Sequence, residues 1–143
     1  MEHQWKLLAG VALVSGMVLA LFASPSFAGT SVRFAADCDH PRAKPRTVLI
    51  SCGDGGLYLT GLRWRKWDQP RATATGTAHR NDCEPFCAAG HFHDYRARLQ
   101  LSDIGYCANT DRMQYRRVTV RFIGSKPRGP RTFSLDYGCG FAT

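Results

Sequence analysis

The segment "DYRARLQL", residues 94 to 101, alternates apolar and polar side chains with a period of two. The apolar members, which share one side of an extended chain, are Tyr95, Ala97, Leu99 and Leu101. The polar members, which share the other side, are Arg96, Arg98 and Gln100. Strict alternation of this kind is typical of a β-strand with one inward and one outward face.

The same signal occurs on both sides of this segment from Thr47 onward. The further predicted strands are "TVLISC" (47–52), "YLTGLRWRKW" (58–67), "RATATGTAH" (71–79), "RRVTVRF" (116–122) and an edge strand "TFSLDYG" (132–138). Alternation places Tyr58, Thr60, Leu62 and Trp64 on one side of the first long strand, and Leu59, Gly61, Arg63 and Arg65 on the other. It sets Ala72, Ala74, Gly76 and Ala78 opposite Thr73, Thr75, Thr77 and His79, and directs Val118, Val120 and Phe122 inward.

The connections between these strands are rich in turn formers, namely "GDGG", "WDQPR", "SDIG" and "GSKPRGP". No stretch after Ala28 keeps a helical apolar period over three turns. The sequence therefore predicts an all-β fold, a small disulfide-stapled antiparallel β-sandwich or partly open barrel. Residues 29–46 are expected to form an irregular N-terminal arm, and residues 47–143 a single β domain.

The N-terminus has the pattern of a secretory signal peptide. Lys6 precedes an apolar run that ends at Phe22, and small residues stand at Ser26 and Ala28. The run is short for a membrane span, which needs roughly 20 apolar residues. We expect residues 1–28 to be removed, the mature chain to begin near Gly29 without a stable membrane span, and the protein to be secreted and extracellular.

The cysteines indicate a disulfide-bonded protein. An even number in an exported chain predicts three bridges, and spacing alone leaves fifteen pairings open. In a plain up-and-down meander, three cysteines would fall at each end of the sheet, so complete pairing would require a crossed connection or a bridge along the sheet. The six residues are Cys38, Cys52, Cys83, Cys87, Cys107 and Cys139.

The charge balance favours an anionic partner. The formal net charge is +8 and is unchanged by loss of the signal peptide, which carries one basic and one acidic residue. Because the outward faces of paired strands form one continuous surface, the outward arginines predict a basic sheet face with an aromatic residue at its border. The candidate residues for this surface are Arg63, Trp64, Arg65, Trp67, Arg96, Arg98, Arg117 and Arg121.

The segment "NDCEPFCAAGHFHDY", residues 81 to 95, allows three interpretations. Zinc could use Cys83, Cys87, His91 and His93, but only three residues separate the two pairs, and an oxidising compartment favours a disulfide. The serines lack the pattern of an activated nucleophile. A connection closed by the two cysteines and bent at Pro85 fits best. We expect no cofactor and no metal, with His91 and His93 as the remaining metal candidates.

Four motifs in this chain resemble a group of small secreted actinobacterial proteins of unassigned function. Their pattern is C-x-D-G, then L-x-x-L-x-W-x-x-W, A-x-G-T and N-D-C-x-P-x-C-A-x-G, matched here within about residues 45 to 123. The resemblance implies export, an all-β domain and stapling through Cys52, Cys83, Cys87 and Cys107, and it implies no catalytic residues. Since Cys38 and Cys139 lie outside the shared stretch, it pairs them with each other, which gives Cys83–Cys87, Cys52–Cys107 and Cys38–Cys139.

Together these features predict a non-catalytic binding domain. The expected partner is an anionic envelope or extracellular polymer, or another secreted or envelope protein, with nucleic acid bound only as a non-specific polyanion. The alternative is a protease or enzyme inhibitor that presents loop 82–91, whose disulfide would lower the entropy lost on binding. A third interpretation is a metal-dependent hydrolase that uses His91 and His93.

Overall fold

The structure is a computed structural model that describes residues 31–140. The described part contains strands and no helix, so the all-β prediction is confirmed and none of it forms a helix that could cross a membrane. The expected signal peptide and the cleavage point near Gly29 lie outside the described residues. The strands are β1 (Phe34–Ala35), β2 (Pro41–Arg42), β3 (Val48–Leu49), β4 (Leu57–Lys66), β5 (Ala72–Asn81), β6 (Phe92–Cys107), β7 (Arg112–Phe122) and β8 (Thr132–Asp136).

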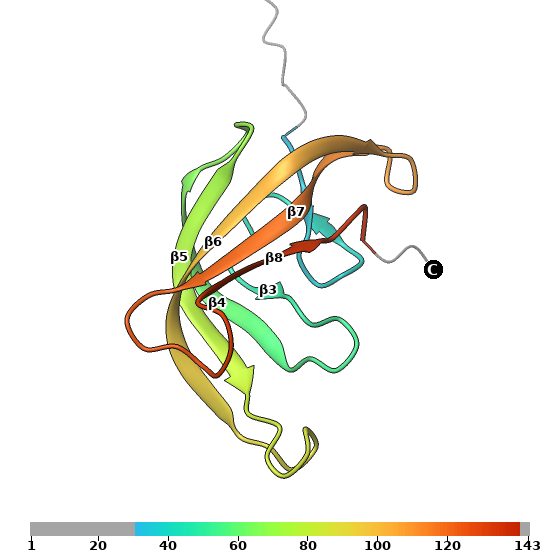
Figure 1. Ribbon diagram of the computed structural model, residues 1–143. Helices are drawn as coiled ribbons and strands as arrows, with labels where there is room; N and C mark the ends of the chain where they lie inside the picture. The colour runs from blue at the N-terminus through green and yellow to red at the C-terminus, as the bar shows by residue number, and fades with distance from the viewer. Residues whose placement is uncertain (1–30, 141–143) are drawn as a thin grey trace, which may run out of the picture.

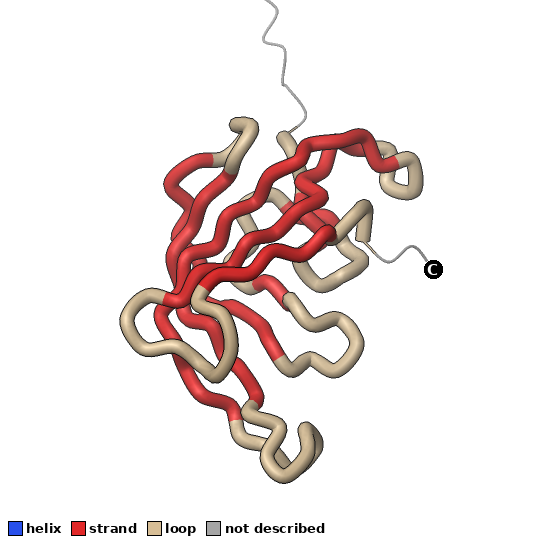
Figure 2. The backbone as a smooth tube through the Cα atoms, viewed as in Figure 1, coloured by secondary structure: helices blue, strands red, loops and turns tan. Residues whose placement is uncertain are grey.

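Six of the strands form one antiparallel sheet in the order of the chain, from β3 to β8. The sheet curls into a half-barrel that is open on one side (Figure 1). Of the two predicted architectures, the partly open barrel is therefore the one that the structure adopts. The predicted irregular arm contains the short hairpin of β1 and β2, and the remaining connections are loops and turns (Figure 2).

The hydrophobic core lies on the concave side of the half-barrel. The fully buried residues of β5 on this side are small, namely Ala72, Ala74 and Ala78, and the curled sheet closes over them. The larger core side chains come from the strands around β5, and burial of each contributes on the order of 1.5–3 kcal/mol. They are Leu57, Leu59, Leu62, Leu99, Leu101, Tyr115, Val118, Val120 and Phe122.

A β-bulge at Gly61 changes the face of β4 on which its side chains lie. The register passes from Thr60 opposite Thr77 directly to Arg63 opposite Thr75, so β4 has one extra residue here. Gly61 has a φ of 61°, a left-handed conformation that glycine adopts readily. The predicted alternation across β4 was wrong because the bulge reverses it: Leu57 and Leu59 are buried before the bulge, Leu62 after it, and Tyr58 and Thr60 face outward.

The bulge brings β4 unusually close to β5. A Cβ on Gly76 would lie 2.5 Å from the carbonyl oxygen of Thr60 and 3.1 Å from Leu62 Cδ2. Glycine in a strand interior commonly marks such a close approach of another backbone. The "ATGTA" motif therefore has a packing explanation, because residue 76 lies where the extra residue of β4 needs space.

The N-terminal arm covers part of the open side of the half-barrel. Phe34 is fully buried, and its ring lies 4.9 Å from that of Tyr137, which follows β8. The Tyr137 hydroxyl donates to the carbonyl oxygen of Leu49 in β3, and burial raises the pKa of Tyr137 to about 12. The arm also pairs with β7 through Arg33, whose N–H donates to the Met113 carbonyl oxygen at 3.0 Å. These contacts connect the two edges of the sheet through the arm.

All six cysteines form disulfides, but only one predicted pair is correct. The bridges are Cys38–Cys52, Cys83–Cys87 and Cys107–Cys139. The predicted pairs Cys52–Cys107 and Cys38–Cys139 were therefore wrong.

The error came from the assumed position of the arm. The arm runs beside β3, where Leu49 N–H donates to the carbonyl oxygen of Ala36 at 2.8 Å, and this places Cys38 next to Cys52. Cys107 ends β6 and Cys139 follows β8. Because alternate strands of an antiparallel meander run in the same direction, the ends of β6 and β8 lie at the same end of the sheet. No crossed connection is needed.

The three bridges should differ in their contribution to stability. They span 14, 4 and 32 residues in chain order, for which the chain-entropy model gives about 3, 2 and 4 kcal/mol. Pairwise replacement by alanine should therefore reduce the free energy of unfolding most for Cys107–Cys139, where Cys107 is also fully buried. Urea unfolding of the three double variants measures the loss in free energy of unfolding for each bridge. An equal or larger loss for Cys83–Cys87 would contradict the expected order.

Candidate functional site

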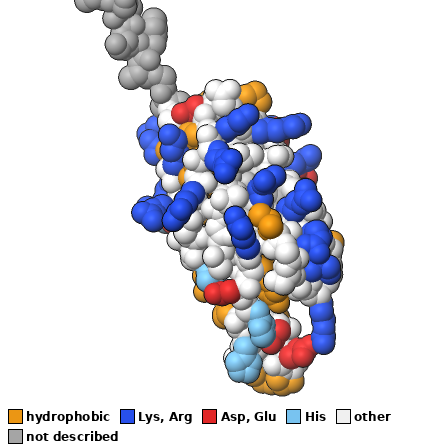
Figure 3. All heavy atoms as spheres, turned by 90° about the vertical axis from the view of Figure 1, so that its left-hand side faces the viewer, with side chains coloured by type: hydrophobic (Ala, Val, Ile, Leu, Met, Phe, Trp, Pro, Cys, Tyr) orange, Lys and Arg blue, Asp and Glu red, His pale blue; other side chains and the backbone are white. Residues whose placement is uncertain are grey.

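The convex side of the half-barrel carries arginines that the strand register sets side by side. Arg98 of β6 lies directly opposite Arg121 of β7, and on its other side Arg98 pairs with Thr75 of β5. Thr75 pairs in turn with Arg63 of β4. Neighbouring strands are about 4.8 Å apart, so this row crosses four strands within about 15 Å. Figure 3, which views this side, shows lysine and arginine side chains spread over much of the surface.

Two further arginines extend the row along the strands. Arg96 precedes Arg98 on the same face of β6, and Arg65 lines with both of them a depression of about 490 Å³. We define the convex arginine patch as Arg63, Arg65, Arg96, Arg98 and Arg121. Within residues 31–140, none of these five side chains has an ion-pair partner. Asp94 lines a depression with Arg63 and Arg96, but its carboxylate contacts His79 and forms no ion pair with these arginines among the described residues.

Arg117 also faces outward on β7, as predicted, but it differs from the patch. Its Nε donates to Asp136 Oδ1 of β8 at 2.7 Å. This hydrogen bond and the charge of Asp136 raise the pKa of Arg117. Its charge is thus already balanced, so we leave Arg117 out of the patch.

The two tryptophans predicted at the border of the basic surface lie on the opposite side of the sheet. Trp64 Nε1 donates to the carbonyl oxygen of Pro45 at 2.7 Å, and Trp67 Nε1 donates to that of Val32 at 2.9 Å. Trp67 belongs to the buried core and Trp64 packs against it. Their predicted place at the surface patch was wrong, because both indoles hold the N-terminal arm against the concave side.

A different aromatic cluster borders the patch on the convex side. The ring of Tyr58 stacks on His79 at 4.6 Å, and Phe92 lies 5.5 Å from Tyr58. Phe92 is 48% exposed, so the cluster presents an apolar surface to solvent. The sequence analysis missed this cluster because it assumed regular alternation along the whole of β4, whereas the bulge at Gly61 reverses the two faces. The glycine at position 61, within an otherwise regular strand, is the signal that could have revealed it.

His79 lies in a hydrogen-bond chain that crosses three strands on this face. Its Nδ1 lies 2.6 Å from Asp94 Oδ1, and its Nε2 lies 2.8 Å from Thr60 Oγ1. Because a carboxylate only accepts hydrogen bonds, Nδ1–H donates to Asp94 and a neutral ring accepts from the Thr60 hydroxyl. The same order of groups activates hydroxyl nucleophiles in hydrolases. In this protein the Thr60–His79–Asp94 chain lies on the convex face of the sheet, where the two hydrogen bonds hold the ring of His79 against Tyr58.

The segment 82–91 is an ordered loop between β5 and β6. Cys83 and Cys87 close it, and Asn81 fastens its base: Nδ2 donates to the Cys87 carbonyl oxygen and Oδ1 accepts from Cys83 N–H, each at 2.8 Å. A side chain at Gly90 would overlap the Asn81 amide. The stapled-connection interpretation of this segment is confirmed.

The predicted metal candidates lie at the base of the same loop. His93 Nε2 lies 2.9 Å from Asp82 Oδ2, whereas the side chain of His91 is exposed. Cys83 and Cys87 are bonded to each other, so they do not supply thiolates for zinc. Among residues 31–140, no three histidine, cysteine, aspartate or glutamate side chains form a group that could hold a metal ion.

Asp82 organises this region through its carboxylate. The hydrogen bond with His93, together with those from the backbone N–H groups of His91 and Glu84, holds the pKa of Asp82 far below its usual value. The charged form of Asp82 is therefore part of the folded loop.

Comparison with known proteins gives no family assignment. No family model, no curated protein and no solved structure matches this chain. The resemblance to secreted actinobacterial proteins stays a prediction, and the candidate sites are assessed by their geometry.

Acid should weaken the protein through Asp82. The pKa of Asp82 is lower in the folded protein than in the unfolded chain. The ionised carboxylate therefore contributes its full stabilisation above the unfolded pKa, near pH 4. This contribution is lost as the pH falls toward the folded pKa. An Asp82→Asn variant should lack this part of the acid dependence. Urea unfolding from about pH 7 to pH 2 measures it. The control is Asp39→Asn, an exposed aspartate whose side chain has no hydrogen-bond partner among the described residues. Identical acid profiles for wild type and Asp82→Asn would refute the role.

Proposed function

We propose that the protein is a secreted, disulfide-stabilised binding domain whose convex arginine patch binds an anionic extracellular polymer. The observation that carries the proposal is the direct pairing of Arg98 with Arg121 across neighbouring strands. Like charges in this position repel and destabilise a sheet. A bound anion between them would remove the repulsion, which gives this part of the sheet a specific affinity for negative charge.

The arrangement of the patch favours a polymer over a single small anion. Its five arginines are spread over β4, β6 and β7, and Arg65, Arg96, Arg98 and Arg121 line two depressions that share Arg98. Arg96 and Arg98 are about 7 Å apart along the strand, and the row across the strands adds contacts in a second direction. A chain with repeated negative groups can contact several of these arginines at once.

Replacement of the patch arginines tests the proposal. The variant Arg63→Gln, Arg96→Gln, Arg98→Gln and Arg121→Gln should bind dextran sulfate at least tenfold more weakly. Each lost contact should lower the slope of log affinity against log salt by about one, and four contacts by about four. The side chains face solvent, so each change should alter the free energy of unfolding by only about 0.5 kcal/mol.

The matched control removes the same charge from other places. It changes Arg42, Arg71, Arg112 and Arg117 to glutamine, all exposed and outside the patch. Affinity and salt slope should stay close to the wild-type values, and isothermal titration at two salt concentrations compares the three proteins. An equal loss in both variants would show that net charge alone drives binding and would refute a specific patch.

A second candidate function, enzyme inhibition, is favoured by Phe86. This side chain is 61% exposed within the loop that Cys83 and Cys87 close. The contacts of Asn81 and Asp82 order the backbone on both sides, which lowers the entropy lost when the loop enters a cleft. Large exposed aromatic residues are common anchors in such interfaces.

The inhibitor candidate is tested with a protease that cleaves after aromatic residues. The wild-type protein should inhibit it with little dependence on salt, and Phe86→Ala should weaken inhibition at least tenfold. Met113→Ala, an exposed apolar residue of the β6–β7 hairpin, is the control and should inhibit like wild type. Steady-state inhibition constants give the comparison. Rapid cleavage of the wild-type loop after Phe86, with no inhibition, would exclude this function.

A further inference from the structure

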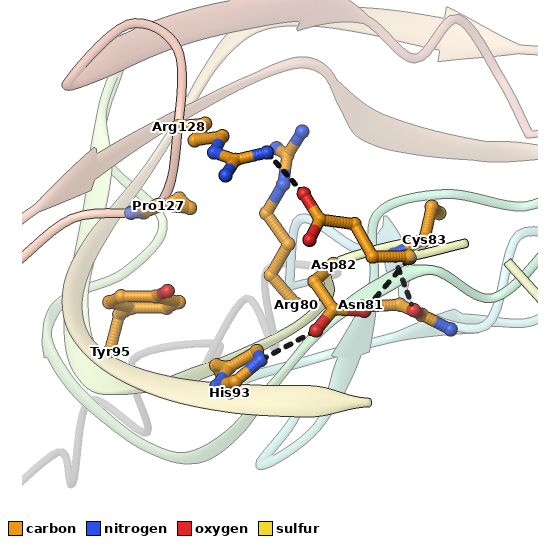
Figure 4. A pocket seen from close by; sticks show the side chains of 9 residues that line it. Arg80, Asn81, Asp82, Cys83, His93, Tyr95, Pro127 and Arg128 are labelled. Atoms are coloured by element: carbon orange, nitrogen blue, oxygen red, sulfur yellow. Dashed lines mark hydrogen bonds and ion pairs between the residues drawn. The ribbon is translucent and has the colours of Figure 1, made fainter. Parts of the chain in front are cut away.

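A pocket of about 440 Å³ lies between loop 82–91 and the β7–β8 loop, away from the convex arginine patch. In Figure 4 the Arg80 side chain lies between Tyr95 and Pro127 on one side and Asp82 on the other, with Arg128 near its guanidinium. His93 also lines the pocket. A volume of this size accommodates a small organic molecule. Sequence reasoning did not find it because its residues come from three separate segments of the chain.

Arg80 is directed to this side of the sheet by its position in β5. It pairs with His93 of β6 and with Leu57 of β4, and Leu57 is a core residue of the concave side. Arg80 is partly buried, and its side chain extends toward Arg128 in Figure 4. Within the described part of the chain, the Arg80 guanidinium has neither a side-chain hydrogen bond nor an ion pair. A partly desolvated cation without a partner is costly, which favours binding of an anion.

The other charged groups of the pocket already have partners. Asp82 contacts His93, and Glu84 forms an ion pair with Arg128. Asp82 also accepts hydrogen bonds from two backbone N–H groups. Among residues 31–140, these two pairs leave Arg80 as the pocket cation without a side-chain partner.

The opposite wall of the pocket is apolar. Pro127 is buried, and the ring of Tyr95 packs edge-on against core residue Phe122 at 5.7 Å. Tyr95 is thus held in place by the core and presents a flat surface within the pocket. The pocket therefore combines one unpartnered guanidinium with a rigid apolar wall.

We propose that this pocket binds a small organic oxyanion, in which a carboxylate or phosphate monoester contacts Arg80 and an attached ring packs on Tyr95 and Pro127. A guanidinium offers two parallel N–H donors, the geometry that both oxyanions accept. This site is separate from the convex arginine patch and does not depend on polymer binding there.

Titration with benzoate, phenyl phosphate and inorganic phosphate tests the site, followed by NMR shifts of the Tyr95 ring. Benzoate or phenyl phosphate should give saturable shifts, and a ligand with a ring should bind at least fivefold more tightly than inorganic phosphate. Binding of benzoate alone identifies a carboxylate site, and binding of phenyl phosphate alone identifies a phosphate site. Absence of saturable binding by both would overturn the proposal.

Variants separate the site from general charge effects. Arg80→Gln should weaken binding at least tenfold, and Arg80→Lys should weaken it less because the charge remains while the paired donors are lost. Arg71→Gln, which removes one exposed arginine at the other end of β5, should bind like wild type. The fourfold variant of the convex arginine patch should also keep this binding, so failure of either site is detected independently. Unchanged affinity in folded Arg80→Gln, checked by circular dichroism, would refute the role of Arg80.

Discussion

Burial of Phe34 beneath the open side of the half-barrel is the interaction on which the rest of the structure depends. A single curled sheet encloses a core only on its concave side, and a gap remains between its two edge strands, β3 and β8. Residues from outside the sheet must close this gap. Phe34, whose ring packs at a tilt against that of Tyr137, occupies that gap, and the Tyr137 hydroxyl donates to the carbonyl oxygen of Leu49 on β3. The Cys38–Cys52 bridge then holds the arm in this position.

Because the core is enclosed on the concave side, few side chains on the convex side are needed for core packing. Both tryptophans and nearly all large aliphatic side chains are used inside, and the outer surface carries arginine, threonine and a small aromatic cluster around Tyr58. The strand register, fixed by the core, is also what places Arg98 beside Arg121. The candidate binding surface and the core therefore depend on the same backbone pairing, although they lie on opposite faces of the sheet.

Sequence reasoning succeeded where one local rule determined the result. The alternation of β5, β6 and β7 predicted their inward and outward faces, because these strands pair without an interruption between β5 and β6. It failed on β4, where one glycine with a positive φ reverses the pattern. The Cys38–Cys52 and Cys107–Cys139 bridges and the Arg80 pocket depend on how separate segments pack together, so residue spacing did not reveal them. The predicted positions of Trp64 and Trp67 were wrong for a related reason, since their hydrogen-bond partners belong to the N-terminal arm.

The three disulfides have a consequence for the integrity of the chain when a protease cuts it. Each bridge closes a covalent ring, and the rings enclose residues 38–52, 83–87 and 107–139. The β6–β7 turn and the long loop between β7 and β8 lie within the last of these rings. An endoprotease that cuts one of these exposed loops once releases no fragment, because both new ends stay attached through sulfur. The molecule would persist as a nicked but continuous covalent unit, with its sheet still assembled.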